Sequence, residues 1–275
     1  MRTLIHFVLH RKNQTNMCLI IFAYQTHPDY HLVLTANRDE IYTRPTQALH
    51  RWPGPIEIYA GKDEQEGGTW LGITKTGRFA AITNYRETGT KTSSLSRGKL
   101  TADFLLGEHS PQQYLKEIVR NQDLYSGFNL ILGEGEDLFY FSNRQHQIKQ
   151  LTPGIHGLSN HLLNTAWPKV TQGKSRLAHL LKQTHFPTPH TLMHSLSDTQ
   201  AAETESLPNT GVGTAAEKML SPIFIKSAVY GTRASTVLTI SKQGEVKLSE
   251  NCFGPHGHKE GSKRYAFFIK GHISS

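Results

Sequence analysis

Short apolar runs rich in leucine and β-branched residues recur along the chain, and turn residues separate them in pairs. CLIIFAY (18–24) and HLVLTA (31–36) flank THPD, in which Pro28 and Asp29 favour a turn. Three further pairs follow the same pattern: WLGIT and FAAIT around Gly77, GFNLILG and DLFYFSN around residues 133–137, and STVLTI and EVKLSE around Gly244. Apolar runs of this length bounded by turn residues predict antiparallel hairpins.

Helical patterns lie between these hairpins. In SPQQYLKEIV, Ser110 is placed to cap a helix, Pro111 occupies its first position and Gln113 completes a capping box. The run LTADFLL before it is amphipathic, and Pro168 predicts the first turn of a helix running on through Leu181. Residues 183–216 are polar and rich in Pro and Thr, so we interpret them as an insertion. Hairpins separated by pairs of helices predict an α+β fold with antiparallel sheets.

The first hairpin places a cysteine beside charged residues. If Tyr24 pairs with His31, Cys18 lies opposite Asn37, with Arg38 and Asp39 one position beyond. Directly opposed Cβ atoms are only about 4.5–5.5 Å apart. The hairpin therefore predicts a thiol next to a guanidinium and a carboxylate.

This arrangement has two interpretations. A thiolate is a nucleophile, and a neighbouring cation lowers the pKa of its thiol. If Met17 is removed, Cys18 also carries an α-amine, which can act as the base for its own side chain. Alternatively, Cys18 is a buried structural residue and the charges belong to a solvated turn. The residues alone leave both interpretations open.

The second hairpin repeats this arrangement, because its outer strand runs into Asn84, Tyr85 and Arg86. We expect the ends of the two strands to form one edge of a ligand pocket. The ligand-binding candidates at this edge are Asn37, Glu40, Tyr85 and Arg86.

Composition narrows the class of protein. The 275 residues carry a formal net charge of +8, but their Lys and Arg are scattered and no nucleic-acid-binding signature accompanies them, so we predict no nucleic-acid partner. Mean hydropathy is −0.45, and no run approaches the ~18 apolar residues that a membrane-spanning helix needs. Two cysteines are too few for a disulfide framework, which favours a reducing, cytoplasmic location.

Residues 1–16 require a separate interpretation. They contain three basic residues and no acidic one, and their apolar stretch LIHFVL has no small-residue cleavage site. This pattern argues against a secretory signal. A targeting segment and an extension from an upstream start codon remain as alternatives, and we favour the extension. We predict a single domain over residues 17–275.

Histidine is frequent, with sixteen residues, but it forms no recognisable metal site. His256 and His258, like His27 and His31, lack cysteine or carboxylate partners at ligand spacing, so we predict no metal site. No C-x-x-C-H motif occurs, which excludes covalent haem. We expect the protein to require no cofactor.

Longer motifs resemble a known family. They are MCLIIFAY, HPDYHLVLTANRDE followed by YTRPT, GGTWLGITKTGRFAAITNYRE, YSGFNLILG, PGIHGLSN with AWPKV, and YGTRASTV. Together they resemble the NRDE family, named after the tetrad Asn37–Glu40, whose eukaryotic representative is transport and Golgi organisation protein 2. The resemblance extends from Met17 to about residue 250. The family is similar to the N-terminal-nucleophile hydrolases, which implies a four-layer αββα sandwich.

The resemblance also implies roles for individual residues. Cys18 would be the nucleophile, and Arg38 and Asp39 would contact its amine and thiol. Asn84 and Asn160 would supply the amide donors of an oxyanion hole, which suits acyl transfer. Arg233 would be the cation that supports the site.

Three functions follow as hypotheses. The family is implicated in intracellular haem trafficking, which implies binding and transfer of haem or a similar amphipathic small molecule. The residues themselves favour an amidohydrolase in which Cys18 attacks a C–N amide bond. The third hypothesis, also implied by the family, is an adaptor in Golgi or membrane-lipid homeostasis that contacts a membrane transiently.

Overall fold

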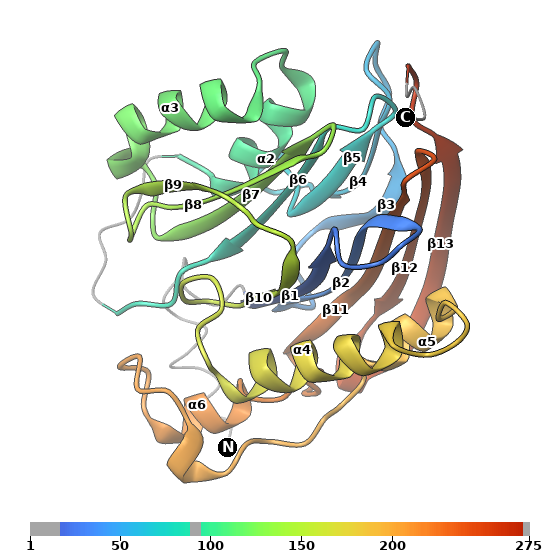
Figure 1. Cartoon of the computed structure of the whole chain (residues 1–275). Coiled ribbons are helices and arrows are strands. Elements are labelled where there is room, and N and C mark those ends of the chain that lie inside the picture. Colours follow the sequence, from blue (N-terminus) through green and yellow to red (C-terminus); the bar gives the residue numbers. More distant parts are fainter. Residues whose placement is uncertain (1–16, 89–94, 272–275) are drawn as a thin grey trace.

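Two antiparallel sheets lie face to face at the centre of the molecule, with helices on both outer faces (Figure 1). The computed structural model describes residues 17–88 and 95–271. The first sheet has the strand order β10 (Gly154–Leu158), β1 (Met17–Tyr24), β2 (Tyr30–Ile41), β11 (Tyr230–Ser241), β12 (Glu245–Phe253) and β13 (Lys259–Phe268). The second has the order β3 (Thr46–Arg51), β4 (Ile58–Asp63), β5 (Leu71–Thr74), β6 (Phe79–Asn84), β7 (Phe128–Glu134), β8 (Asp137–Ser142) and β9 (Gln147–Gln150).

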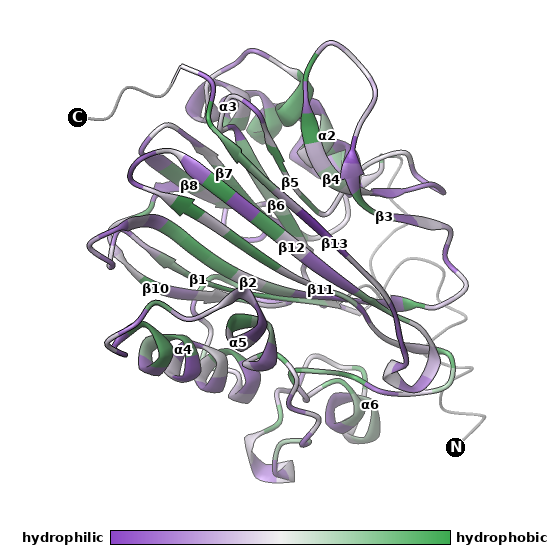
Figure 2. Ribbon diagram, turned by 90° about the vertical axis from the view of Figure 1, so that its right-hand side faces the viewer, coloured by the Kyte–Doolittle hydropathy of each residue, from purple (hydrophilic) through white to green (hydrophobic). Residues whose placement is uncertain are grey.

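Helices cover the outer face of each sheet (Figure 2). Those on the second sheet are α2 (Arg97–Leu106) and α3 (Pro111–Asn121), and those on the first are α4 (Pro168–Leu181) and α5 (Pro189–His194). A further short helix, α6 (Thr214–Met219), lies near the first turn of α4 (Figure 1). The predicted α+β fold and its four αββα layers are therefore confirmed.

Apolar cores lie between the two sheets and between the first sheet and its helices. Between the sheets, Phe22 and Leu34 of the first sheet pack with Phe79 and Tyr140 of the second, all at most 2% exposed. Leu19 and Ile21 on the other face of β1 pack under α4 and α5. Both faces of β1 and β2 are covered, so apolar side chains are stabilising on either face. This explains why apolar and polar residues hardly alternate along these two strands.

The four predicted hairpins and the capping box at Ser110 are confirmed. The register of the first hairpin was predicted wrongly by one residue: Tyr24 pairs with Leu32, and Cys18 pairs with Arg38 rather than Asn37. A slip of one residue moves every side chain to the opposite face. Strands that are apolar on both faces carry no signal that distinguishes the two registers.

Two polar stretches are more ordered than predicted. The tetrad Asn37–Glu40 does not leave the sheet as a turn, because β2 continues through Ile41. Residues 183–216 are not simply an insertion, because they include α5 and contribute the buried side chains of Leu192 and Leu196 to the core under the first sheet. The predictions for residues 1–16 fall outside the described part of the chain and stay predictions, as does the single domain over 17–275.

Two glycines set the position of α4. A Cβ on Gly157 of β10 would meet Val170 Cγ1 at 2.7 Å, and one on Gly173 would meet Ile21 Cγ1 at 2.8 Å. Both glycines therefore allow α4 to approach the sheet closely. This approach brings the first turn of α4, with Lys169, against the end of β2.

Candidate functional site

Cys18 lies in β1 directly opposite Arg38 of β2, and it is 8% exposed. Alternation along β1 puts its side chain on the face that carries Ile20 and Phe22, between the sheets. Burial and the negative charge of Asp39 raise the pKa of the thiol to about 12, although the Arg38 charge and the Asp39 backbone N–H both lower it. With Met17 attached, the thiol is therefore protonated at neutral pH.

The tetrad alternates across β2, so its four side chains serve two different faces. Asn37 points to the helix side, where its Nδ2 donates to the carbonyl oxygens of Leu196 (3.0 Å) and Ile223 (2.8 Å). Its Oδ1 accepts a bond of 2.6 Å from Ser235 Oγ. Asn37 was predicted to bind a ligand, but its amide is used in these internal hydrogen bonds and joins the 195–225 segment to the sheet.

Arg38 and Glu40 face the space between the sheets. The Arg38 guanidinium lies 4.3 Å from the ring centre of Trp70, 3.5 Å from Glu40 Oε2 and 3.9 Å from Asp63 Oδ2. Arg44 joins the same group through Asp63 (2.8 Å) and Glu40 (3.6 Å). This network of two arginines and two acids fixes the Arg38 charge beside the thiol.

Asp39 has one oxygen that lacks a partner. Its Oδ1 accepts a hydrogen bond of 2.6 Å from Thr232 Oγ1, whereas its buried Oδ2 has no hydrogen-bond partner within the described residues. Burial raises the pKa of Asp39 to about 6, against the charges of Lys169 and Arg38. The hydroxyl of Tyr230 is equally buried and unpaired in that part of the chain, and burial and Asp39 raise its pKa. Buried polar groups are normally paired, so these two groups mark a place where a partner can bind.

The ends of β6 and β10 bring the two predicted amide residues together. Asn160 Nδ2 donates to the Asn84 carbonyl oxygen (3.0 Å). The neighbouring Ser159 Oγ donates to the Cys18 carbonyl oxygen (3.1 Å), and its own carbonyl accepts from Thr83 Oγ1 (2.7 Å). Through the neighbouring residues Thr83 and Ser159, these bonds connect the two asparagines to Cys18 at the start of β1.

The remaining predicted residues have mainly internal partners. Arg233 donates to the Arg44 carbonyl oxygen (2.5 Å) and so lies beside the Arg38 network. Arg86 forms an ion pair with Glu217 of α6, with both side chains at most 4% exposed, and packs 4.8 Å from the Trp167 ring centre. Tyr85 packs beside His161, with ring centres 4.9 Å apart and the rings tilted by 36°.

Two charged residues of the site were missed in the sequence. Arg97 at the start of α2 interacts electrostatically with Cys18 and Glu40, and burial lowers its pKa to about 10. Its position depends on Gly68, where a Cβ would meet the Gly98 carbonyl carbon at 2.2 Å, so the two backbones touch. Lys169, the second, is 3% exposed and faces Asp39 from α4. The motif AWPKV, which contains Lys169, was the sequence signal that could have identified this residue.

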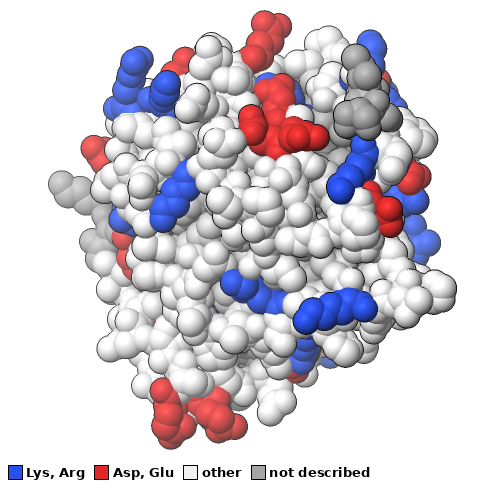
Figure 3. Space-filling view, viewed as in Figure 1, with Lys and Arg blue, Asp and Glu red and all other residues white. Residues whose placement is uncertain are grey.

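The described residues show neither a cluster of metal ligands nor a membrane-spanning helix. Among the described residues, no cluster of three or more His, Cys, Asp or Glu side chains is arranged to hold a metal ion. No helix in the same part of the chain is long and apolar enough to span a membrane. Figure 3 shows one face of the molecule, where basic and acidic side chains form small separate groups and no single-sign patch dominates.

Most of the chain resembles proteins of one family. The family model described as Transport and Golgi organisation 2 matches residues 17–255. The homologues from Mus musculus and Homo sapiens are each 34% identical over 254 residues, covering 85% of this chain and 92% of theirs. The Drosophila melanogaster protein is 26% identical over 268 residues, covering 88% and 95%.

Two solved structures show a looser likeness. A Caenorhabditis elegans orthologue of N-acylethanolamine-hydrolysing acid amidase has a TM-score of 0.39 at 12% identity, over 80% of this chain and 92% of its own. A mutant conjugated bile acid hydrolase from Clostridium perfringens has a TM-score of 0.44 at 8% identity, over 93% of both chains. The sequence matches carry the assignment without them: the chain belongs to the Transport and Golgi organisation 2 family.

Proposed function

We propose that Cys18 is the nucleophile of an amidohydrolase that becomes active when Cys18 is the first residue of the chain. The observation that carries this proposal is the buried Oδ2 of Asp39, for which the described part of the chain supplies no hydrogen-bond partner. Asp39 pairs with Met17 across the two strands, so it lies opposite the peptide bond that precedes Cys18. Cutting that bond creates an α-amine, and Asp39 Oδ2 is the acceptor available to hold it.

The free amine supplies the base that the attached chain lacks. It takes the thiol proton, and the thiolate attacks the amide carbonyl carbon to form a tetrahedral intermediate. The C–N bond then breaks, the leaving nitrogen takes the proton from the ammonium, and water hydrolyses the thioester. Asn84 and Asn160 are the candidate donors to the oxyanion, an interaction that is often worth about 2.7–4 kcal/mol.

The test compares chains that begin at Cys18 with chains that keep Met17. The Cys18 form should hydrolyse at least one member of a panel of acyl-amides, and Cys18→Ala should abolish that hydrolysis. Cys252→Ala is the matched control, because Cys252 lies half-buried in β12, and it should leave the activity unchanged. Hydrolysis that survives Cys18→Ala would refute the role of Cys18.

A second function, binding and transfer of haem or a similar amphipathic small molecule, is supported by the state of the thiol. With Met17 attached, a thiol pKa of about 12 leaves Cys18 protonated and unreactive, so a function of that form would not use Cys18 as a nucleophile. A carrier should bind haem with a saturable absorbance change, and transfer to an apo-acceptor should survive Cys18→Ala. Non-saturating uptake would refute this function.

Location belongs to the same proposal. The two free cysteines suit a reducing compartment, and on that ground we propose a cytosolic location. Fractionation that recovered the endogenous protein in an oxidising compartment would contradict this location. The role as an adaptor in Golgi or membrane-lipid homeostasis stays a prediction from the family resemblance.

A further inference from the structure

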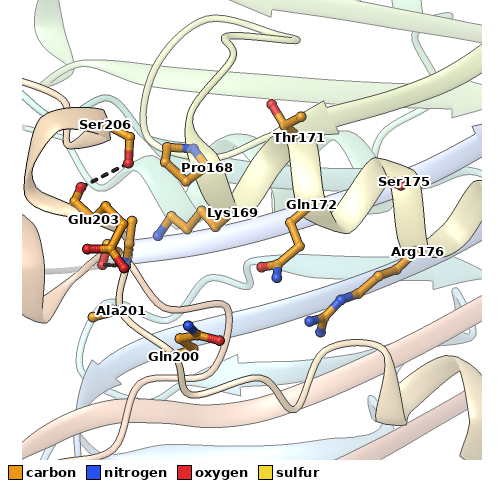
Figure 4. Close-up of a pocket in the computed structure, with 12 residues that line it drawn as sticks. Pro168, Lys169, Thr171, Gln172, Ser175, Arg176, Gln200, Ala201, Glu203 and Ser206 are labelled. Carbon is orange, nitrogen blue, oxygen red and sulfur yellow. Dashed lines mark hydrogen bonds between the residues drawn. The ribbon is translucent and has the colours of Figure 1, made fainter.

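A groove of about 770 Å³ lies beside the Cys18 site and shares Lys169 with it, between α4 and the segment that follows α5 (Figure 4). One wall is the first half of α4, which presents Lys169, Gln172 and Arg176 along a single helix face. Gln200, Glu203 and Ser206 lie on the opposite wall. Its volume falls within the range of about 300–1,000 Å³ that is typical of small-molecule sites.

Lys169 is a buried cation with no carboxylate at ion-pair distance among the described residues. It is 3% exposed, and its Nζ donates to the Leu220 carbonyl oxygen at 3.1 Å. Within residues 17–88 and 95–271 it forms no ion pair, and Asp39 is the carboxylate that acts on it most strongly through its charge. An ammonium has three N–H donors, so the carbonyl leaves two of them available. A buried charge without a paired counter-ion is costly unless a ligand supplies one.

The other charges of the groove differ in their pairing. Arg176 is neutralised by an ion pair with Asp198, which also accepts a bond of 3.1 Å from Gln172. Glu203 is exposed on the opposite wall, and its carboxylate has no ion-pair partner in the described part of the chain. The groove therefore presents one available positive charge and one available negative charge on facing walls.

We propose that this groove binds a short zwitterionic peptide of dipeptide size. Its carboxylate would accept hydrogen bonds from Lys169 Nζ, and its ammonium would donate to the Glu203 carboxylate. The peptide group between them would meet the amides of Gln172 and Gln200 and the hydroxyl of Ser206, whose Oγ donates to the Glu203 carbonyl oxygen at 2.9 Å. This proposal does not rest on the chemistry of Cys18.

Calorimetric titration of the full chain with three small probes tests the charge requirement. Glycylglycine carries both charges, acetylglycine lacks the ammonium, and glycinamide lacks the carboxylate. We expect saturable binding of glycylglycine, with acetylglycine weaker and glycinamide weakest. The proposal would be overturned if the binding of glycylglycine did not saturate, or if glycinamide bound as tightly as glycylglycine.

Variants then assign the two charges to residues. Lys169→Met should weaken glycylglycine binding at least roughly tenfold, which corresponds to ~1.4 kcal/mol. Glu203→Gln should weaken glycylglycine binding but not acetylglycine binding, and its exposed position makes folding insensitive to the change. The matched controls are Lys218→Met and Glu205→Gln, exposed residues that do not line the groove. If Lys169→Met and Glu203→Gln bound glycylglycine as tightly as their control variants, the site would be refuted.

Discussion

The buried ion pair between Arg86 and Glu217 should be the most sensitive electrostatic contact of the fold. Glu217→Gln keeps the size of the side chain and an oxygen that can accept from Thr210, whose N and Oγ1 bond Glu217 Oε1 at 2.9 and 2.5 Å. It removes the negative charge that faces Arg86, and the two side chains are only 4% and 3% exposed. The change therefore leaves a buried guanidinium without this carboxylate.

The expected loss follows from that burial. Breaking a buried pair by removing one partner costs about 3–5 kcal/mol, and the retained hydrogen bonds place Glu217→Gln near ~3 kcal/mol. For a domain of this size, that loss lowers the melting temperature by roughly 6–12 °C. Urea unfolding followed by tryptophan fluorescence measures the free energy, and calorimetry measures the melting temperature.

The control is an exposed pair of the same chemistry. Arg51 and Glu57 are 3.0 Å apart, but their side chains are 53% and 38% exposed. Glu57→Gln should therefore cost less than ~1 kcal/mol. If Glu217→Gln and Glu57→Gln destabilised the protein equally, the claim that the Arg86 pair is buried and stabilising would be wrong.

Three further predictions concern the residues around Cys18. Asn37→Ala should lower the free energy of unfolding by at least ~3 kcal/mol, because it leaves two buried carbonyl oxygens unpaired; a loss below ~1 kcal/mol in urea unfolding would contradict its structural role. Asp39 has a pKa of about 6 when folded and 3.8 as its ordinary value, so its contribution to stability is present below pH 3.8 and is lost as the pH rises through 6. Asp39→Asn should therefore gain ~3 kcal/mol relative to the parent between pH 4 and pH 7, and parallel pH profiles would exclude the raised pKa. Gly68→Ala should destabilise the protein by ~1–3 kcal/mol by pushing the start of α2 away, and a crystal structure with Arg97 unmoved would refute this.

Local patterns predicted most of the secondary structure. The capping box at Ser110 and the proline at 168 involve residues close in sequence, so their signals are independent of the rest of the fold. The register of β1 and β2 was not predictable in the same way, because both strands are apolar on both faces. The tetrad alternates because β2 continues through Ile41, and the register decides that Arg38 is the residue paired with Cys18; both features emerged only from the structure.

The candidate site likewise contains some residues that are close in sequence and others that are far apart. Cys18, Arg38 and Asp39 are neighbours in one hairpin, and the sequence placed them together. Arg97 and Lys169 reach the site from two helices far away in the chain, through the contact of Gly68 with Gly98 and the close packing of α4. Long-range contacts of this kind leave no periodic signal in a single sequence.

The measurement that tests the central claim most directly is the alkylation rate of Cys18 in a chain that begins at that residue. Mass spectrometry after timed iodoacetamide treatment of the folded protein resolves Cys18 from Cys252, whose thiol pKa burial and Glu250 raise to about 12. The account predicts that Cys18 reacts at least tenfold faster near pH 7, and that Arg38→Ala slows it by raising its pKa. Equal rates at the two cysteines in this form would contradict a nucleophilic Cys18 supported by Arg38 and Asp39.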